Sequence, residues 1–375
     1  MSTTTISSMN KYLLWVRSAG RCQYIGCNKE LHTDILTKKR FNQSYIAHIV
    51  ADQPDGPRGD KIRSPLLAND IDNLMLLCDS HHRLIDKIEV SAHSEPILLE
   101  MKREHEERIR NVTSIHPDKK SFIVSYNANI GDNTPNVTYP YISNFLLPDY
   151  FPSQDSSIDL GVVNSLNKDS DPDFWEIEIK NLKRKFDRYL LPRIKSGEIN
   201  HISLFGFAPI PLLIRLGGLM NDILTVDVRQ KRRVPDTWAF DQDIETEYIY
   251  GGKLRSANLI ALKIELSGDI TDDRIKNVLG EDVSIYSIRI DNPNNDFVKS
   301  RKQIKDFGNK VKHVLNDLKK KHGQDVILHL FPAMPVALAV EFGRVWMPKA
   351  DMTVKIYDQN SCLGGFLEAL YLRQE

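Results

Sequence analysis

The chain has little cysteine, no net charge and no long apolar run, and each of these shortages excludes a class of protein. Its 375 residues include four cysteines, too few for the disulfide framework of a secreted protein. Cys362 stands alone and is expected to be a small buried residue. Fifty basic residues balance fifty acidic ones, so composition alone does not indicate a nucleic-acid binder. No apolar run approaches the roughly 20 residues that cross a bilayer, and the first residues do not resemble a signal peptide. We therefore expect a cytoplasmic protein of two or three domains without a membrane partner.

The cysteines and histidines that are present gather in the first third of the chain. Seven of the eleven histidines precede residue 117. Cys22 and Cys27 form a Cys-x4-Cys pair, and about 50 residues later Cys78 and His81 form a Cys-x2-His pair. Zinc takes thiolate and imidazole ligands tetrahedrally, so these four residues are expected to hold a structural Zn²⁺. Two alternatives stay open: His81 and His82 exchange roles, or the thiols are buried without a metal.

A histidine, an asparagine and a second histidine follow one another in an order suited to phosphodiester hydrolysis. His48 ends the run Tyr-Ile-Ala-His, Asn73 begins the run Asn-Leu-Met-Leu-Leu-Cys, and His82 follows that run. Hydrolysis needs a base that activates water and a cation that offsets the charge developing on the phosphate. We expect His48 to be the base, Asn73 to hold the loop or orient the base, and His82 to bind a catalytic Mg²⁺ or another divalent ion. Taken singly, each histidine is more often a structural residue.

The elements expected around these three residues are a strand, a loop, a second strand and a helix, over residues 44–50, 52–59, 72–77 and 81–86. With them, residues 10–112 resemble the HNH endonuclease family. The resemblance implies an α+β domain of the ββα-metal type with a zinc knuckle. Many relatives carry an acidic residue or a histidine immediately before the base, whereas this sequence has Ala47. Asp52, Asp72 or water could therefore complete the catalytic metal site.

The pattern changes after residue 118. A charged helix is expected over residues 96–111, because a proline suits its first turn and its i,i+4 charge pairs suit a solvated face. The segment that follows is rich in Pro, Asn and Asp, with one expected strand at residues 122–126. We predict an N-terminal domain, a junction that could also begin the second domain, and a C-terminal domain, over residues 1–118, 119–173 and 174–375.

From residue 174 onward, helical and strand patterns alternate, which is typical of α/β architecture with a largely parallel sheet. The expected helices cover residues 174–196, 212–220, 272–279 and 297–322 and start again at 337. The expected strands cover residues 201–207, 223–228, 258–266, 283–290, 325–331 and 352–357, the last of which is expected to close the chain. Residues 201–217 and 326–343 also share the order strand, proline-containing turn, helix and glycine, which suggests a pseudo-twofold duplication.

The two proline-containing turns are candidate ligand sites. Each leads from a strand into a helix N-terminus, where backbone N–H groups can bind an anion. We expect both turns to lie at the ends of adjacent strands, where α/β sheets bind ligands. The run Gln-Lys-Arg-Arg-Val-Pro-Asp-Thr-Trp at 230–238 adds cations and an aromatic plane for phosphate and base. Taken singly, the turns are more often connections and the basic run a solvated loop. The expected ligand-binding residues are Phe207, Pro209, Pro211, Arg229, Arg232, Trp238, Pro332, Met334, Pro335 and Tyr357.

The C-terminal half resembles the SAVED domain, in which two CARF-like (Rossmann-like) units are fused. The stretches that carry the resemblance are residues 207–213, 262–270 and 330–337. An HNH domain followed by SAVED is the layout of an effector nuclease of cyclic-oligonucleotide-based antiphage signalling (CBASS). The resemblance implies a cyclic di- or trinucleotide activator, a ligand-induced homo-oligomer, and non-specific cleavage of double-stranded DNA. The alternatives are a restriction-type HNH nuclease whose C-terminal domain reads modified DNA, and a non-catalytic binding protein stapled by zinc.

Overall fold

The computed structural model of the chain contains two compact units. It describes residues 4–130, 137–162, 168–171, 173–221, 224–241, 244–252, 258–360 and 364–373. One unit covers Met1–His116 and the other covers Pro117–Glu375. The expectation for Cys362 lies outside the described residues. None of the described helices combines the length and apolarity that a membrane span needs.

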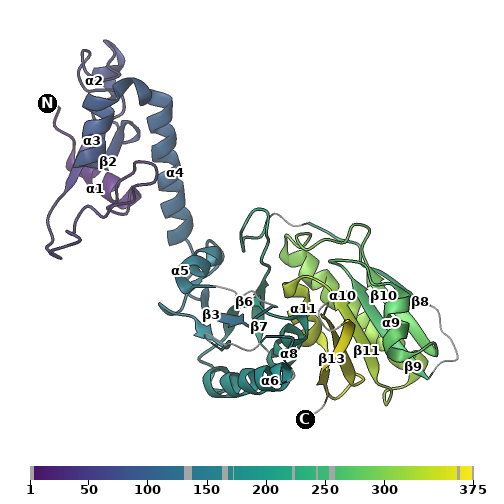
Figure 1. Ribbon diagram of the computed structural model, residues 1–375. Coiled ribbons are helices and arrows are strands. Elements are labelled where there is room, and N and C mark those ends of the chain that lie inside the picture. Colours follow the sequence, from purple (N-terminus) through teal and green to yellow (C-terminus); the bar gives the residue numbers. More distant parts are fainter. Residues whose placement is uncertain are drawn as a thin grey trace. The chain divides into compact units, whose positions relative to one another are not determined.

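The first unit is built around a short antiparallel hairpin and a helix (Figure 1). Strands β1 (Ser44–His48) and β2 (Leu74–Cys78) pair so that His48 faces Leu74. All five residues of β2 are buried, which explains its continuous apolar run. The described helices of the unit are α1 (Ser8–Arg17), α2 (Arg63–Leu67), α3 (Asp79–Arg83), which follows β2, and α4 (Glu95–Thr113). Short helical turns lie at Ile71–Asn73, Leu84–Ile88 and Val90–Ala92.

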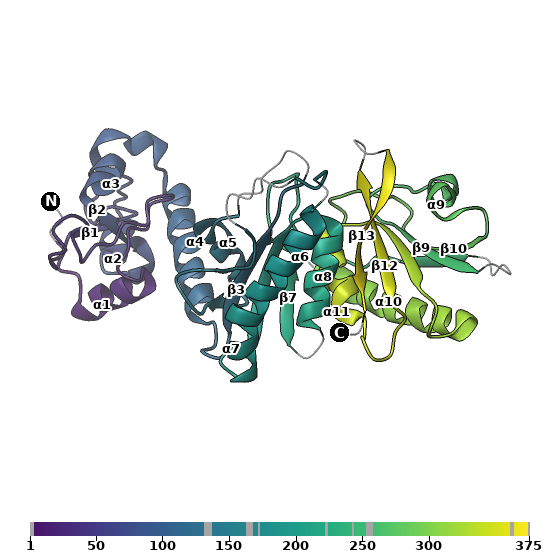
Figure 2. The same ribbon diagram turned by 60° about the horizontal axis from the view of Figure 1, so that its bottom comes forward.

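The second unit begins with an all-parallel sheet in the order β4-β3-β6-β7. Its strands are β3 (Lys120–Asn127), β4 (Phe151–Pro152), β6 (His201–Phe207) and β7 (Thr225–Arg229), and β5 (Ile158–Asp159) also pairs with β3. Its helices are α5 (Tyr139–Ile142), α6 (Phe174–Lys185), α7 (Leu191–Lys195) and α8 (Ile210–Met220), with helical turns at Ser143–Leu146 and Phe186–Leu190. Helices α6 and α8 cover the face of the sheet that points forward in Figure 2.

The six-stranded sheet of the second unit has the order β13-β12-β11-β9-β10-β8. Its four inner strands are parallel and its two edge strands are antiparallel. The strands are β8 (Ile249–Gly252), β9 (Leu259–Glu265), β10 (Val283–Arg289), β11 (Leu328–Ala333), β12 (Val354–Asn360) and β13 (Gly365–Leu372). The helices are α9 (Asp272–Leu279), α10 (Arg301–His322) and α11 (Val336–Val345).

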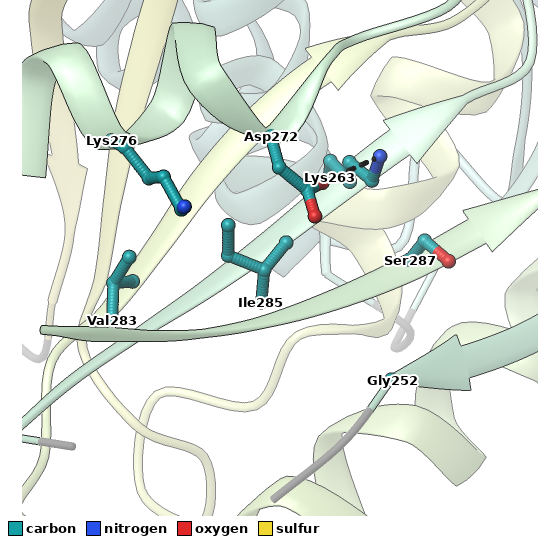
Figure 3. Close-up of a pocket in the computed structure, with 7 residues that line it drawn as sticks. All are labelled: Gly252, Lys263, Asp272, Lys276, Val283, Ile285 and Ser287. Atoms are coloured by element: carbon teal, nitrogen blue, oxygen red, sulfur yellow. Dashed lines mark ion pairs between the residues drawn. The ribbon is translucent and has the colours of Figure 1, made fainter. Parts of the chain in front are cut away.

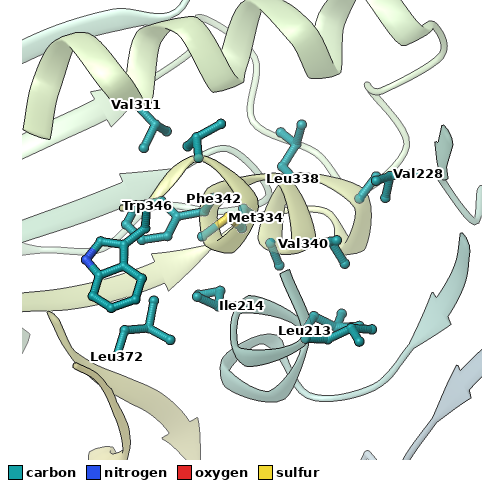
Figure 4. Packing of buried hydrophobic residues seen from close by; sticks show 14 of the residues in the cluster. Leu213, Ile214, Val228, Val311, Met334, Leu338, Val340, Phe342, Trp346 and Leu372 are labelled. Carbon is teal, nitrogen blue, oxygen red and sulfur yellow. The ribbon is translucent and has the colours of Figure 1, made fainter. Parts of the chain in front are cut away.

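Helices α8 and α11 join the two sheets through one shared hydrophobic core. Figure 4 shows Ile214 of α8 near Val340 of α11, with Val311 of α10 on the other side of α11. Two glycines permit the close approach of the backbones. A Cβ on Gly217 would lie 2.0 Å from the carbonyl oxygen of Val340, and a Cβ on Gly343 would lie 1.9 Å from that of Ile214. These are the glycines at which the two sequence repeats end.

Two features of the second unit differ from the sequence-based expectations. The strand at 352–357 does not close the chain, because β13 follows it and pairs with it antiparallel. The two proline-containing turns follow strands of separate sheets rather than adjacent strands, since β6 and β11 each pair with other partners. The segment 119–173, expected to be a junction or the start of the second domain, supplies β3, an inner strand of the first sheet.

Candidate functional site

Three cysteines and a histidine of the first unit converge. The Sγ atoms of Cys22, Cys27 and Cys78 and a ring nitrogen of His81 all lie within 4.8 Å of one another. The Nδ1 of His81 is 3.7 Å from Cys22 Sγ and 3.1 Å from Cys78 Sγ. Ligands of a tetrahedral zinc ion are about 3.3–3.8 Å apart at the usual bond lengths. The donor set and its spacing therefore fit a structural zinc ion.

The electrostatics of this cluster also suit a cation. Burial, with smaller contributions from the charges of the neighbouring Cys78 and Cys27 sulfurs, raises the pKa of the Cys22 thiol to about 12. Burial also lowers the pKa of His81, which favours the neutral imidazole that binds metals. A bound cation would favour the thiolate forms that burial otherwise disfavours.

Tyr24 holds the His81 ring in place. The two rings stack in parallel with their centroids 4.1 Å apart. The Tyr24 hydroxyl lies 3.0 Å from Nε2 of His93, and Nδ1 of His93 lies 2.8 Å from the carbonyl oxygen of Glu89. A carbonyl only accepts, so His93 Nδ1 donates to it, and Nε2 is left to accept from the tyrosine. Neither Tyr24 nor His93 was identified from the sequence, because their roles depend on contacts between distant segments.

His48 and Asn73 lie at the joint between the two strands and the loop that connects them. Nε2 of His48 is 2.9 Å from the carbonyl oxygen of Ala68. Because a carbonyl only accepts, Nε2 carries the proton and the lone pair lies on Nδ1. Asn73 accepts from the Val50 N–H at 2.8 Å and donates to the carbonyl oxygens of Val50 at 2.8 Å and Leu67 at 3.1 Å. The asparagine thus fixes the backbone just beyond His48, which is one of the two roles expected for it.

His82 is close to an acidic residue that the sequence analysis did not consider. Its ring stacks on Tyr45 of β1, with centroids 5.1 Å apart, and its Nε2 lies 3.4 Å from Oδ2 of Asp86. Burial lowers the pKa of His82, although the carboxylate of Asp86 acts in the opposite direction. A neutral imidazole and a carboxylate at this spacing can share one divalent ion. The interval of four residues along a helix is the signal that could have identified Asp86.

Arg58 connects the two histidines through hydrogen bonds. It has a φ of +58°, and its guanidinium is almost fully buried. It donates to the Ile49 carbonyl oxygen at 2.6 Å, to the Ile85 carbonyl oxygen at 2.9 Å and to Oδ1 of Asp86 at 2.7 Å. One side chain therefore ties the exit of β1, next to His48, to the helical segment that carries Asp86.

The two aspartates expected near the catalytic metal have other partners in the structure. Asp72 is largely exposed and pairs with Arg17 of α1 at 2.9 Å. The carboxylate of Asp52 accepts from the backbone N–H of Thr4 at 3.2 Å. Asp86, by contrast, has its carboxylate 3.4 Å from Nε2 of His82.

A cavity of about 340 Å³ lies in the second unit where β6 and β11 end. Both proline-containing turns contribute to its wall, together with residues that follow β7 and the end of β12. Five of the expected ligand-binding residues line it, namely Phe207, Pro209, Pro332, Met334 and Pro335. This is the position at which parallel sheets bind ligands, outside the carboxyl ends of the strands.

The other five expected residues do not line this cavity, and each has a structural role instead. Trp238 is completely buried and packs edge-on against Phe205, with ring centroids 5.2 Å apart. It belongs to the small core on the face of the first sheet opposite to α6 and α8. It is therefore a core residue here, because the loop after β7 folds it back onto the sheet. Pro211 is likewise buried within α8.

The two expected arginines are held by carboxylates. Arg232 donates to both oxygens of Asp241 at 2.8 and 3.0 Å. Arg229 is buried beside Asp227, 2.8 Å away. Tyr357 points to the opposite face of its strand, where its ring stacks on Phe331 at 4.5 Å. Side chains alternate along a strand, so the next residue, Asp358, is the one that lines the cavity.

The two helix N-termini at this cavity are not equivalent. At α11, the side chain of Gln230 accepts from the backbone N–H of Ala337 at 3.0 Å. At the corresponding position of α8, two residues after the proline that precedes the helix, the chain has Pro211, which carries no N–H. The cavity is thus built from two similar halves whose polar groups differ.

A second cavity, of about 450 Å³, lies between α9 and strands β8, β9 and β10 (Figure 3). Its two lysines already have partners. Lys263 contacts Glu265 at 3.1 Å and Asp272 at 2.9 Å, and Lys276 pairs with Glu281 at 2.8 Å. Paired cations offer little to an anionic ligand, and this cavity is not at the carboxyl ends of the strands. The cavity at β6 and β11 is therefore the stronger candidate.

Solved structures of other proteins resemble this chain at low sequence identity. No curated protein matches the chain. The Acinetobacter baumannii Cap4 SAVED/CARF-domain containing receptor, solved with the cyclic trinucleotide 2'3'3'-cAAA, is 13% identical, with a TM-score of 0.46 over 74% of this chain and 56% of that chain. The Moraxella osloensis Cap4 SAVED/CARF-domain containing receptor is 12% identical, with a TM-score of 0.42 over 76% and 60% of the two chains. The present chain thus spans less than two thirds of each of these proteins.

The family model of SAVED, the "SMODS-associated and fused to various effectors sensor domain", matches residues 182–372, slightly more than half of the sequence. The chain therefore belongs to the SAVED family of sensor domains.

Proposed function

We propose that this chain is a metal-dependent HNH endonuclease of antiphage defence that cleaves double-stranded DNA after its SAVED domain binds a cyclic di- or trinucleotide. The observation that carries the nuclease half is the arrangement around His48. A buried histidine with its lone pair fixed on Nδ1 lies in the same small unit as a neutral histidine, a carboxylate and a zinc-type cluster.

The residues of the first unit have distinct roles in this proposal. His48 accepts the proton of the attacking water at Nδ1, while its Nε2–H stays bonded to the Ala68 carbonyl oxygen. Asn73 keeps the backbone after His48 rigid, so that the base does not move away from the water. His82 and Asp86 would hold a divalent ion such as Mg²⁺, which supplies charge neutralisation to the phosphate and the leaving oxygen.

The zinc-type cluster would serve stability rather than chemistry. A full set of four protein ligands is typical of structural zinc, whereas catalytic zinc keeps one position open. The first unit has a small apolar core centred on β2, and small domains of this kind often depend on a metal.

The sensor half of the proposal is supported by the family and by the cavity. The SAVED family is described as a sensor domain, and the cavity at the ends of β6 and β11 has polar groups of both signs on its wall. Arg233 supplies positive charge there, and so does Lys231, although Lys231 also pairs with Asp236; the phosphates of a cyclic oligonucleotide require such charge. For binding to control cleavage, the ligand must favour one state over another. We propose that this state is a homo-oligomer that brings nuclease units together.

A plasmid-cleavage assay tests the nuclease. Wild-type protein, His48→Ala and the control His32→Ala are each incubated with supercoiled plasmid and Mg²⁺. A panel of cyclic di- and trinucleotides is then added to each reaction. His32 is half-exposed and pairs with Glu30, so it controls for the loss of a histidine elsewhere in the same unit. Cleavage by wild type and His32→Ala but not by His48→Ala is the expected result. Cutting by His48→Ala at the wild-type rate would refute the assignment of the base.

The same assay separates the alternatives. Full cleavage without any cyclic nucleotide, limited to methylated plasmid, would support a restriction-type nuclease that reads modified DNA. Absence of cleavage under every condition, with zinc present at one equivalent per chain, would support a non-catalytic binding protein. Light scattering with the activating nucleotide tests assembly, because activation without an increase in mass would remove the oligomer from the proposal.

A further inference from the structure

The charged groups around the SAVED cavity are unevenly distributed. Lys231 and Arg233 follow β7, whereas Asp358 lies on β12, in the other half of the unit. Lys231 stays close to Asp236 and to the ring of Tyr141, 5.3 Å away. The cavity therefore presents its cations from the half that carries β7, and carboxylates from both halves, since Asp169 and Asp296 also line it.

The carboxylates of this cavity differ in how much of their hydrogen-bonding capacity is already used. Asp296 accepts from the backbone N–H groups of Arg233 at 2.9 Å and Val234 at 3.2 Å, one at each oxygen. Asp358, by contrast, interacts with the backbone N–H of its neighbour Gln359. Burial, and then the charge of Asp169, raise the pKa of Asp358 to about 7. The carboxylate of Asp358 can thus accept further hydrogen bonds. It lies at a largely buried position, where a charged group with few hydrogen-bond partners costs free energy.

We propose that Asp358 determines base specificity by accepting two hydrogen bonds from one nucleobase edge that presents adjacent N–H donors, namely N1–H and the 2-amino group of guanine. This inference rests on the proposed function, because it concerns the same ligand. The two N–H donors of guanine favour the ionised form of Asp358, because hydrogen bonds donated to a carboxylate stabilise its charge. In that form the side chain has two acceptor oxygens and no donor, so it matches two neighbouring donors side by side. The corresponding edge of adenine offers one donor and one acceptor, which leaves one carboxylate oxygen facing a lone pair. A phosphate would be repelled by Asp358 and is directed to the side of Lys231 and Arg233.

Base-substituted ligands test this inference on the full-length protein. Isothermal titration calorimetry is performed with cyclic di-guanylate, cyclic di-adenylate, the mixed guanylate–adenylate ring, the corresponding trinucleotides, and rings in which hypoxanthine replaces guanine. Hypoxanthine retains N1–H but lacks the 2-amino group. Since a hydrogen bond to a charged group contributes to affinity by about tenfold to a hundredfold, wild type should bind a guanine ring at least about tenfold more tightly than its hypoxanthine analogue.

Asp358→Asn is the decisive variant. An amide offers one donor and one acceptor, so it matches adenine better than guanine. The variant should lose the preference for guanine over hypoxanthine and gain affinity for adenine rings relative to guanine rings. Asp325→Asn, at an exposed position between α10 and β11, is the matched control and should keep the wild-type order of affinities.

The outcomes distinguish this inference from the function on which it rests. If no cyclic nucleotide binds wild type, the proposed ligand class is wrong and the inference falls with it. If rings bind and wild type does not distinguish guanine from hypoxanthine, or Asp358→Asn keeps the wild-type order, the sensor proposal stands and the role of Asp358 is refuted.

Discussion

The crossing of α8 and α11 gives the sharpest prediction about stability. Gly217→Ala should strongly destabilise the SAVED unit, whereas Gly218→Ala, one residue later in the same helix, should not. A Cβ at position 217 would lie 2.0 Å from the Val340 carbonyl oxygen and 2.9 Å from the Arg344 nitrogen. Both atoms belong to the backbone of α11, so no side chain can rotate to relieve the clash. A Cβ at position 218 would meet Leu372 at an ordinary 3.5 Å.

The expected difference follows from the two contacts. Both substitutions replace glycine in a helix by alanine, which by itself favours the helix by about 1 kcal/mol. Gly217→Ala would also force the two backbones apart by about 1 Å, since Cβ contacts shorter than 3.0 Å essentially never occur. Overpacking a rigid core costs about 1–3 kcal/mol, and a contact between two backbones belongs at the upper end. The two variants should therefore differ by about 3 kcal/mol, or by about 6–12 °C in melting temperature for a unit of this size.

Thermal unfolding by circular dichroism, with chemical denaturation as a second measure, would test this difference. The glycine of the other repeat provides an independent check, because a Cβ on Gly343 would lie 1.9 Å from the Ile214 carbonyl oxygen. Gly343→Ala should therefore resemble Gly217→Ala. Equal melting temperatures for Gly217→Ala and Gly218→Ala would refute the conclusion that these glycines set the distance between the halves.

Two further predictions concern the metal cluster and the response to pH. Cys78→Ser should lower both the zinc content, measured by elemental analysis, and the melting temperature of the first unit. The reason is that a structural zinc contributes about 10–16 kcal/mol to folding in zinc-finger peptides. Wild-type protein that contains no zinc would contradict the assignment. His201 has its pKa lowered to about 4, first by burial and then by the nearby cations of Arg229, Arg301 and Lys119, against the opposing charge of Asp227. Because the unfolded chain takes up this proton near pH 6.5 and the folded one does not, the SAVED unit should lose stability as the pH falls from about 6.5 to 4. His201→Gln should reduce that loss in urea titrations at pH 7 and pH 4.5, and an unchanged pH dependence would show that other groups cause it.

Much of the architecture could be predicted because local patterns and long-range structure agree. The apolar run at 201–207 is the buried strand β6 with the same bounds, and the glycine at the end of each repeat is where the two helices touch. The cysteine and histidine pairs at 22–27 and 78–81 come together because β2 carries the second pair to the first. In these cases, the spacing of residues along the chain was enough to predict which of them lie in a strand or come together.

Other features depended on contacts that spacing does not encode. Trp238 follows a proline and two polar residues, which suggested exposure, yet it fills the core beside Phe205. Strand β13 has an apolar pattern interrupted by Glu368, and only its antiparallel pairing with β12 reveals it as an edge strand. Arg58 lies in a loop rich in Gly and Pro, and its importance arises from a φ of +58° and from the distant carbonyl groups to which it donates.

The unequal helix starts at the SAVED cavity have a consequence for how a ring-shaped molecule would be oriented. At the N-terminus of α11, a backbone N–H already donates to the side chain of Gln230, and at the corresponding position of α8 the chain has Pro211, which has no N–H. A ring with twofold symmetry could enter in two equivalent orientations, which adds RT ln 2, or about 0.4 kcal/mol, to its binding. A ring with two different bases has no such degeneracy and must find the one orientation in which each base meets its own partner. Departure from symmetry in the receptor would therefore let one cavity distinguish a ring of two different bases from a ring of two identical ones.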